Sequence, residues 1–329
     1  MDSPSGARTD GGAQKCQKPA RAAAIALGWL SMFSSLGACL LVLACAPRVG
    51  QVPATPDSYA FQNPQRVAIE GYDGDAMEPF VSRDGKYLFF NNLNEPNVNT
   101  NLHWAERIDD LHFKYRGELA GVNTPALEGV PSMDRDGNFF FVSNRSYDKT
   151  ASTLYRSKFA DGAVSNVELV PGVSLGKPGI VNFDAEISAD GNTLYFVESQ
   201  FSLFGNPKTA RILIARRSGN SFVRDPASPK LLQTVNSDAL TYAPATSASE
   251  CELFFTRVGP PGSGLQGPAI YLTRRANRTL PFEAPRRLAA INGFVEGPSL
   301  SADEQSLYYH KKENGHMVLY RVTRAAPKP

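Results

Sequence analysis

The stretch "MEPFVSRDGKYLFFNN", Met77 to Asn92, decides the fold because the chain repeats it. A second stretch, "EGPSLSADEQSLYYHKK" from Glu296 to Lys312, places Pro, Ser, an acid and an apolar doublet at matching offsets. Three further copies begin near Val130, Asp184 and Tyr242, and the shared Pro/Ala position recurs at steps of 52, 54, 59 and 54 residues. A period of this length indicates an architecture built from repeated small units.

Each copy predicts a β-hairpin. In the first three copies Asp-Gly separates two apolar strands, and this pair supplies the positive φ that a tight turn needs. The last two copies carry Ser249-Glu250 and Asp303-Glu304 at that place, so their turns are less certain. A third strand and a fourth, usually Phe-started strand follow each hairpin, for example at 101–107 and 113–119. Five such units predict an all-β fold, a five-bladed β-propeller of four-stranded antiparallel blades over residues 60–325.

The two ends of the repeat predict how the ring closes. The fifth unit ends after its third strand near Arg324, while "FQNPQRVAIE", Phe61 to Glu70, precedes the first unit. That segment repeats the Phe, Pro, Arg and aliphatic spacing of "FEAPRRLAAI" from Phe282. We therefore expect the N-terminal strand to complete the last blade, which protects the sheet edges of the ring.

Composition excludes some classes of function. The chain has 329 residues, is 42% hydrophobic and carries a formal net charge of +2. The first 45 residues account for that charge, so the remainder is neutral, which argues against a nucleic-acid partner. Of four cysteines only Cys251 lies outside the N-terminal segment, and no disulfide framework is predicted.

The N-terminal residues resemble a targeting segment. Lys15, Lys18 and Arg21 precede residues 22–45, which carry no charge, as in a secretory signal peptide or a membrane anchor. "VLAC" ends at Cys45 and resembles a bacterial lipoprotein lipobox; Cys39 offers a second such site, and an uncleaved anchor or a soluble secreted form are the alternatives. A Pro-rich tether follows at 46–59. We expect a membrane-anchored lipoprotein of the cell envelope that faces the periplasm or the exterior.

The Pro-x-x-Ser-x-Asp-Gly-x-x-Leu-Tyr-Phe pattern of the copies resembles the WD-repeat-like blades of the TolB-type propeller family. The resemblance covers about residues 60–324 and implies a propeller fold and a periplasmic or outer-membrane setting. TolB itself carries a small domain before its propeller, for which the tether is too short. Because the same blades serve several roles, the resemblance says little about function.

Three short motifs match known sites but fit the repeat better. "GVSLG" at 172–176 matches a nucleophile elbow, yet Ser174 occupies a slot that the other units fill with Asn. "GSGLQG" at 262–267 is followed by no helix, and "DRDGN" at 134–138 is a hairpin turn rather than a calcium loop. The four His lack metal-ligand spacing. We therefore expect no catalytic motif, no metal site and no cofactor.

Acidic residues at the starts of the first strands are the best site candidates, because first strands line the channel of a propeller. The predicted binding residues are Glu78, Asp184, Glu186, Tyr242 and Glu296, with Phe201 and Phe204 on a long loop of the same face. The alternative is a solvated channel mouth with loop-filling aromatic rings.

Two functions remain open on the sequence. The first is a non-catalytic envelope lipoprotein whose propeller is a scaffold for an envelope protein or a cell-surface polymer. The alternative is a glycan-active hydrolase that uses Glu78, Asp184 and Glu296, since two carboxylates suffice for glycoside hydrolysis. We expect the first, and therefore no catalytic residue.

Overall fold

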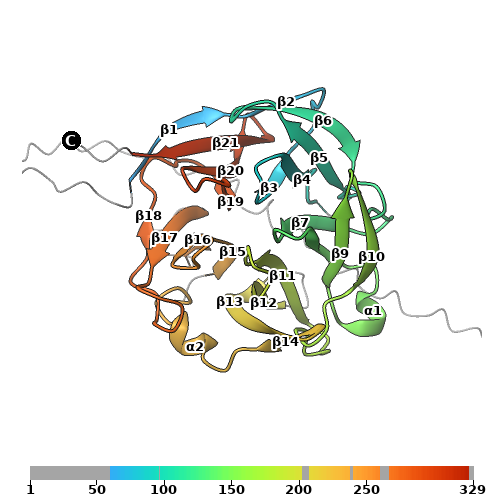
Figure 1. Ribbon diagram of the computed structural model, residues 1–329, viewed down its shortest axis with the longest axis vertical. Helices are drawn as coiled ribbons and strands as arrows, with labels where there is room; N and C mark the ends of the chain where they lie inside the picture. The colour runs from blue at the N-terminus through green and yellow to red at the C-terminus, as the bar shows by residue number, and fades with distance from the viewer. Residues whose placement is uncertain (1–59, 96, 202–206, 238–239, 260–266, 326–329) are drawn as a thin grey trace, which may run out of the picture.

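The computed structural model describes residues 60–95, 97–201, 207–237, 240–259 and 267–325. Five sheets stand in a ring around one axis, which confirms the predicted five-bladed β-propeller (Figure 1). The predicted leader, the tether and Cys45 lie outside the described residues. Within the described part of the chain, no helix is both long and apolar enough to cross a membrane.

Each blade is named here by its order in the chain, and its strands are given from the axis outward. Blade 1 contains β3 (Met77–Val81), β4 (Tyr87–Asn91), β5 (Leu102–Arg107), β6 (His112–Glu118) and β2 (Ala68–Glu70). Blade 2 contains β7 (Glu128–Met133), β8 (Asn138–Ser143), β9 (Leu154–Ala160) and β10 (Ala163–Leu169). Blade 3 contains β11 (Ile180–Ile187), β12 (Thr193–Phe201), β13 (Pro207–Ser218) and β14 (Ser221–Arg224). Blade 4 contains β15 (Leu240–Thr246), β16 (Glu252–Val258), β17 (Ala269–Arg274) and β18 (Arg286–Arg287). Blade 5 contains β19 (Val295–Leu300), β20 (Ser306–Glu313), β21 (His316–Arg324) and β1 (Phe61–Arg66). Two one-turn helices, α1 (Tyr147–Thr150) and α2 (Ser228–Leu231), lie in the connections.

The closure of the ring agrees with the prediction over its first six residues and differs after them. β1 pairs antiparallel with β21, from Phe61 opposite Arg324 to Arg66 opposite Tyr320, and so completes blade 5 (Figure 1). The predicted strand does not continue in that blade. Val67 still donates its N–H to the carbonyl of Leu319 at 2.9 Å, but the next residues form β2, which pairs parallel with β6 of blade 1. One extended segment therefore ties two neighbouring blades together.

The outer strands vary most between blades. In the second unit the outermost strand, β10, has seven residues. In the fourth unit the eleven residues from Phe282 yield only the two-residue strand β18, because Phe282 and Leu288 turn inward to the core instead of alternating along an edge. Outer strands face solvent on one edge, so the repeat constrains them least.

The hairpin turns explain the Ser-x-Asp-Gly signature. Ser82 donates its hydroxyl to Asp84 at 2.6 Å, and the following Gly85 adopts a φ of 73°. In the last two copies Glu250 and Glu304 take the glycine position with φ of 58° and 60°. The turns of the last two copies therefore have the same conformation as those of the first three. A residue with a Cβ in the left-handed region costs about 1–2 kcal/mol of conformational free energy.

The core lies between the blades and consists mainly of apolar side chains from the middle strands. Buried aromatic rings meet edge to face, as Phe89 does with Phe139 of the next blade at 5.1 Å between centroids. Such contacts add about 0.5–1.5 kcal/mol each beyond the area they bury. The ring is held by many of these inter-blade contacts rather than by one central core.

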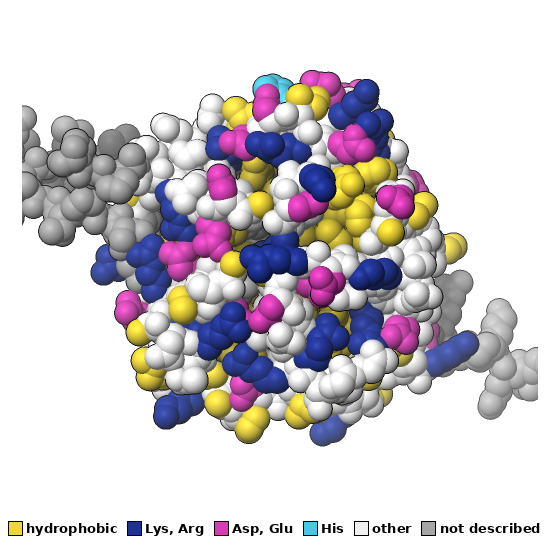
Figure 2. Space-filling view, in the orientation of Figure 1, with side chains coloured by type: hydrophobic (Ala, Val, Ile, Leu, Met, Phe, Trp, Pro, Cys, Tyr) yellow, Lys and Arg dark blue, Asp and Glu magenta, His cyan; other side chains and the backbone are white. Residues whose placement is uncertain are grey.

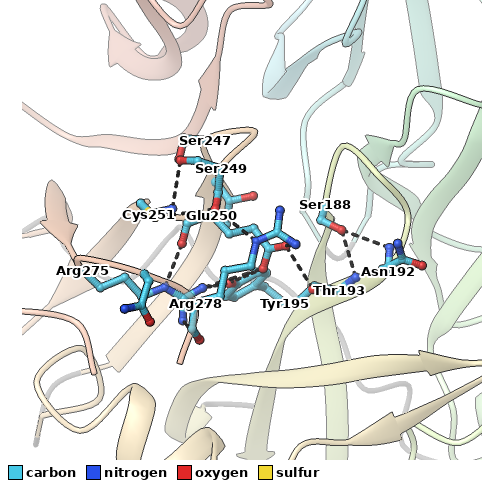
Figure 3. A network of polar contacts seen from close by, with 12 residues as sticks. Ser188, Asn192, Thr193, Tyr195, Ser247, Ser249, Glu250, Cys251, Arg275 and Arg278 are labelled. Carbon is cyan, nitrogen blue, oxygen red and sulfur yellow. Dashed lines mark hydrogen bonds and ion pairs between the residues drawn. The ribbon is translucent and has the colours of Figure 1, made fainter. Parts of the chain in front are cut away.

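A buried ion network ties blade 3 to blade 4 (Figure 3). The side chain of Glu250 is fully buried and accepts a hydrogen bond from the hydroxyl of Tyr195 at 2.9 Å. The equally buried Arg275 donates to the same hydroxyl at 2.8 Å and lies 3.7 Å from the Glu250 carboxylate. Arg278 Nη1 at 3.2 Å and Arg216 Nη1 at 3.8 Å also face the Glu250 carboxylate, so this buried charge is balanced by several cations rather than by one.

Candidate active site

The innermost strand of every blade is broken by a bulge at the same place, just before the repeated Pro/Ala position. The register of β3, for example, shifts between Met77 and Phe80. The first bulge residue of each blade has a positive φ, as seen in Glu78, Val130, Asp184, Ala243 and Gly297, with φ between 49° and 63°. These five residues line one cavity at the axis of the ring. The bulge thus aims one position per blade at the axis, and in two blades that position is an acid.

Side chains of neighbouring blades hold these bulges in place. Four of the five bulge residues donate their backbone N–H to a side chain of the preceding blade. The donor and acceptor pairs are Glu78 to Nδ1 of His310 (3.1 Å), Val130 to Asn91 (3.0 Å), Ala243 to Asp184 (2.8 Å) and Gly297 to Thr256 (3.2 Å). A residue in the left-handed region persists only where its surroundings impose it. This ring of hydrogen bonds supplies that constraint.

Three carboxyl groups from three blades meet at the axis, from Glu78, Asp184 and Glu296. Asp184 and Glu296 are 6% and 3% exposed, and Glu78 is half-buried at the cavity wall. The carboxylate of Glu296 accepts hydrogen bonds from the Tyr242 hydroxyl and from Nε2 of His310, the latter at 3.2 Å. Among the described residues no hydrogen-bond partner is found for the Glu78 carboxyl group. Glu78 therefore lies at the cavity with both carboxyl oxygens unused by the protein.

Burial and mutual repulsion change the acidity of this cluster. Burial, and then the charges of Asp184 and Glu296, raise the pKa of Glu78 well above its usual value of 4.5. Burial and the charge of Glu296 raise the pKa of Asp184 to about 7, against the lowering effect of the Ala243 N–H. Burial and the charge of Glu296 also raise the pKa of Tyr242 well above 10. The raised pKa favours the protonated form of Glu78, and at neutral pH Asp184 is divided between its two forms.

His310 is placed as a neutral imidazole. Its Nδ1 accepts the N–H of Glu78, so that nitrogen carries no proton, and its Nε2 must then donate to Glu296. The ring is 0% exposed and joins the backbone of one acid to the carboxylate of another. His310 fixes how Glu78 and Glu296 lie relative to each other.

The cavity at the acids is small and partly open. It measures about 40 Å³ and is lined by the three acids and Tyr242, together with Asn91, Asn94, Thr100, Leu127, Gly129, Val130, Val142 and Phe183. That volume suits a few water molecules. A sugar ring would therefore rest at the mouth and present one bond to the acids.

An ion pair lies in a second axial cavity, which shares Glu78 and Asp184 with the first. Arg83 reaches across from blade 1 and places Nη2 2.6 Å from Oε1 of Glu186, with side chains only 11% and 5% exposed. Glu186 also accepts hydrogen bonds from the Ser132 hydroxyl at 2.7 Å and the Thr246 N–H at 3.1 Å. In Figure 2 side chains fill the middle of the ring on the face in view, and charges of both signs are mixed across it. The acid cavity is thus not one end of an open pore.

The structure divides the predicted site residues into two groups. It brings Glu78, Asp184, Tyr242 and Glu296 together at one cavity. Glu186 does not line that cavity; it lines the adjoining axial cavity and is paired there with Arg83. Phe201 is not on an exposed loop: β12 extends through it, and its ring is buried in the core around blade 3. Phe204 lies outside the described residues.

His310 and Asn91 are site residues that the sequence reasoning missed. They occupy the same slot at the end of the second strand, opposite Glu296 and Met77 respectively. Polar residues at that slot interrupt an otherwise apolar strand, as does Thr256 in blade 4. That interruption was a usable signal, because a polar residue buried in a strand needs a partner.

The other sequence motifs have structural roles here. Ser174 donates to the carbonyl of Ala151 at 2.9 Å, and no helix follows it. Asp134 accepts the N–H groups of Asp136 and Asn138, both at 2.9 Å, and so closes its hairpin turn. Across the described ranges, no group of three or more His, Cys, Asp or Glu residues is arranged to hold a metal ion.

Comparison with known proteins gives similarity of structure only. No family model matches the chain, and no curated protein matches it. A solved structure described as a glycoside hydrolase superposes with a TM-score of 0.52 at 12% identity, over 84% of this chain and 96% of that one. A family 117 glycoside hydrolase from the marine bacterium Zobellia galactanivorans superposes with a TM-score of 0.50 at 10% identity, over 81% and 91%. TolB from Acinetobacter baumannii covers 77% of this chain and 55% of its own, with 13% identity and a TM-score of 0.42.

These comparisons correct the expected function. TolB-type propellers are among the structural neighbours, but the superposition is too loose to carry an argument about function. The neighbours that superpose over most of both chains include glycoside hydrolases. These findings contradict the expectation of a non-catalytic scaffold without a catalytic residue. At these identities the likeness itself concerns the fold.

Proposed function

We propose that the chain is a glycoside hydrolase that acts at the acid cavity on the propeller axis. One observation carries the proposal: carboxyl groups from three blades converge there, and burial and repulsion give them different acidities. Cleavage of a glycosidic bond needs one carboxyl group that holds a proton and one carboxylate that is ionised. Pairs of acids whose surroundings separate their pKa values are the usual way to provide both.

Glu78 is the proposed general acid. Its raised pKa favours the protonated form, and its carboxyl group has no partner among the described residues that would hold that proton back. It would donate the proton to the oxygen of the leaving group. The positive φ of 49° and the Nδ1 of His310 hold its backbone, so the carboxyl group is presented from a fixed position.

Asp184 is the proposed base or nucleophile. One of its oxygens accepts the Ala243 N–H, which leaves the other for water or for the sugar. Both oxygens of Glu296 are occupied by Tyr242 and His310, so its proposed part is to supply the negative charge that keeps the proton on Glu78. This charge would also stabilise a positively charged, oxocarbenium-like transition state.

The test is a screen for hydrolysis on polysaccharides and aryl glycosides. We expect wild-type activity that Glu78→Gln and Asp184→Asn each lower at least a hundredfold, while Asp136→Asn, an exposed acid on a hairpin turn, leaves it unchanged. Activity should rise with pH through about 7 as Asp184 ionises, and fall at higher pH when Glu78 loses its proton. Turnover that persists in both variants would refute the assignment, and no turnover of any glycan would refute the function.

We further propose that the enzyme works in the cell envelope on a polymer outside the cytoplasm. The support is the basic and then uncharged stretch over residues 15–45, with Cys45 as the lipid acceptor. Fractionation of cells that produce the tagged full chain tests the location. Recovery in the cytoplasmic fraction would contradict it.

A further inference from the structure

Resting on the proposed function, we infer that the site takes an uncharged sugar and that Asn94 orients it through a pair of neighbouring hydroxyl groups. The inference names a substrate class and a specificity residue. It depends on which charges line the cavity and on which polar side chains remain available there.

The charge of the cavity is of one sign. Its ionisable lining residues are the three acids and Tyr242, and no Lys or Arg lies among the lining residues that the structure describes. Arg83 lines the adjoining axial cavity, which shares Glu78 and Asp184 with this one, but its guanidinium group is paired with Glu186 at 2.6 Å. The internal segments outside the described residues, 96, 202–206, 238–239 and 260–266, contain no Lys or Arg in the sequence. A uronate or a sulfated sugar would meet like charge without a counter-charge, and such repulsion rejects a ligand effectively.

Three polar side chains from the end of β4 and from the loop between β4 and β5 line the cavity, and two of them are already engaged. Asn91 accepts the Val130 N–H at 3.0 Å and donates to the carbonyl of Asn92 at 2.9 Å. Thr100 donates to the carbonyl of Leu93 at 3.1 Å. Asn94 has no hydrogen-bond partner within the described part of the chain, although it lines the same cavity. Its amide is the group left for a ligand.

The loop that carries Asn94 is held at its base. The amide of Asn92 donates to the carbonyl of Asn99 at 3.0 Å and accepts the N–H of Asn101 at 2.7 Å. Between them, Val98 donates its N–H to the carbonyl of Glu95 at 3.0 Å, which forms a turn. Asn94 is thus presented from a closed loop rather than from a free one, and little ordering is needed when a ligand binds.

An amide suits a neutral sugar. It offers one acceptor and two donors in a plane, so it can bind two adjacent hydroxyl groups at once. Loss of such a pair of hydrogen bonds costs about tenfold or more in affinity. The acids opposite would then face the ring from the side of the bond to be cut.

Binding measured without turnover tests the inference separately from the proposed function. The full chain with Glu78→Gln, purified in detergent at pH 7.5, is titrated with neutral gluco-, galacto- and xylo-oligosaccharides and with oligogalacturonides of equal length. We expect at least one neutral series to bind at least tenfold more tightly than the uronates. Adding Asn94→Ala should weaken that binding about tenfold, while Asn97→Ala, an exposed residue of the same loop outside the cavity, should not change it.

Each outcome decides the matter. Tighter binding of oligogalacturonides, equal effects of Asn94→Ala and Asn97→Ala, or no binding of any oligosaccharide would overturn the inference. Selective binding with the expected Asn94 effect supports it even if the wild type hydrolyses none of these glycans. In that case the hydrolase function fails and the sugar site stands.

Discussion

Replacement of Asp184 by Asn should make the propeller more stable above neutral pH, because burial and the nearby charge of Glu296 disfavour the ionised form of this carboxyl group. Its pKa is about 7 in the folded chain against an ordinary value of 3.8. That difference of about 3 pKa units corresponds to about 4 kcal/mol at 1.36 kcal/mol per unit. Asn keeps an oxygen that can accept the Ala243 N–H, now at 2.8 Å from the carboxylate, so the packing of the bulge is retained.

The sign of the effect follows from where the proton is bound. Below about pH 4 Asp184 is protonated in both states and costs nothing. Between pH 4 and 7 the unfolded chain loses this proton while the folded chain keeps it, so the wild type loses stability relative to the variant as pH rises. The gain in the free energy of unfolding for Asp184→Asn should therefore be near zero at pH 4, about 2 kcal/mol at pH 5.5 and about 4 kcal/mol at pH 8.

Guanidinium denaturation of the purified chain at these three pH values measures the effect. Glu186→Gln is the matched control, since Glu186 lies two residues along the same strand but is paired with Arg83 at 2.6 Å. That change leaves a buried cation unpaired and should lower stability by about 3–5 kcal/mol at pH 8. The reasoning would be refuted if Asp184→Asn destabilised the chain at pH 8, or if its effect did not vary with pH.

Three further predictions concern other parts of the chain. A Cβ on Gly297 would lie 2.7 Å from Oε2 of Glu78, whereas a Cβ on Gly315 would meet nothing within 4 Å. Both glycines have a positive φ, so Gly297→Ala and Gly315→Ala should each lower the free energy of unfolding by about 1 kcal/mol. Only Gly297→Ala should also lower the activity, by about a hundredfold. Equal activities of these two variants would show that the acid is not held as tightly as its contacts indicate. Arg275→Ala should lower the free energy of unfolding by about 1–3 kcal/mol, because it removes the buried donor to the Tyr195 hydroxyl while Arg278 at 3.2 Å still faces the Glu250 carboxylate; an unchanged free energy of unfolding in denaturation curves would contradict this account of the network. Cys45→Ser should abolish lipid attachment, seen as a lower mass of the mature chain, and an unchanged lipid mass would move the attachment site elsewhere.

Much of the fold could be predicted because the same strand–turn–strand pattern occurs five times in the sequence. Ser82, Asp84 and Gly85 close a turn by hydrogen bonds within five residues, so the hairpin is already written in the local sequence. The period counted the blades, and the similarity between the segments from Phe61 and Phe282 indicated how the ring closes. The crossing of the chain from β1 to β2 was not predictable, because it depends on backbone partners in two different blades.

The candidate site shows the same division more sharply. The alternation of strands around an axis predicted that Glu78, Asp184 and Glu296 would approach one another, although they lie more than fifty residues apart in sequence. The same alternation could not separate Glu186, whose charge is cancelled by Arg83, from the three that share one cavity. Nor could it show that His310 links Glu78 to Glu296.

The sequence by itself thus determined the repeated unit, the number of blades and the acids that face the axis, because each depends on local periodicity. The tertiary structure alone decided which of those acids are paired and which are left at a cavity. The reason is physical: the acidity of a carboxyl group depends on burial and on charges within a few ångströms, and here those charges come from other blades. A repeat specifies its own strands, but only the closed ring brings the neighbours that give each acid its chemistry.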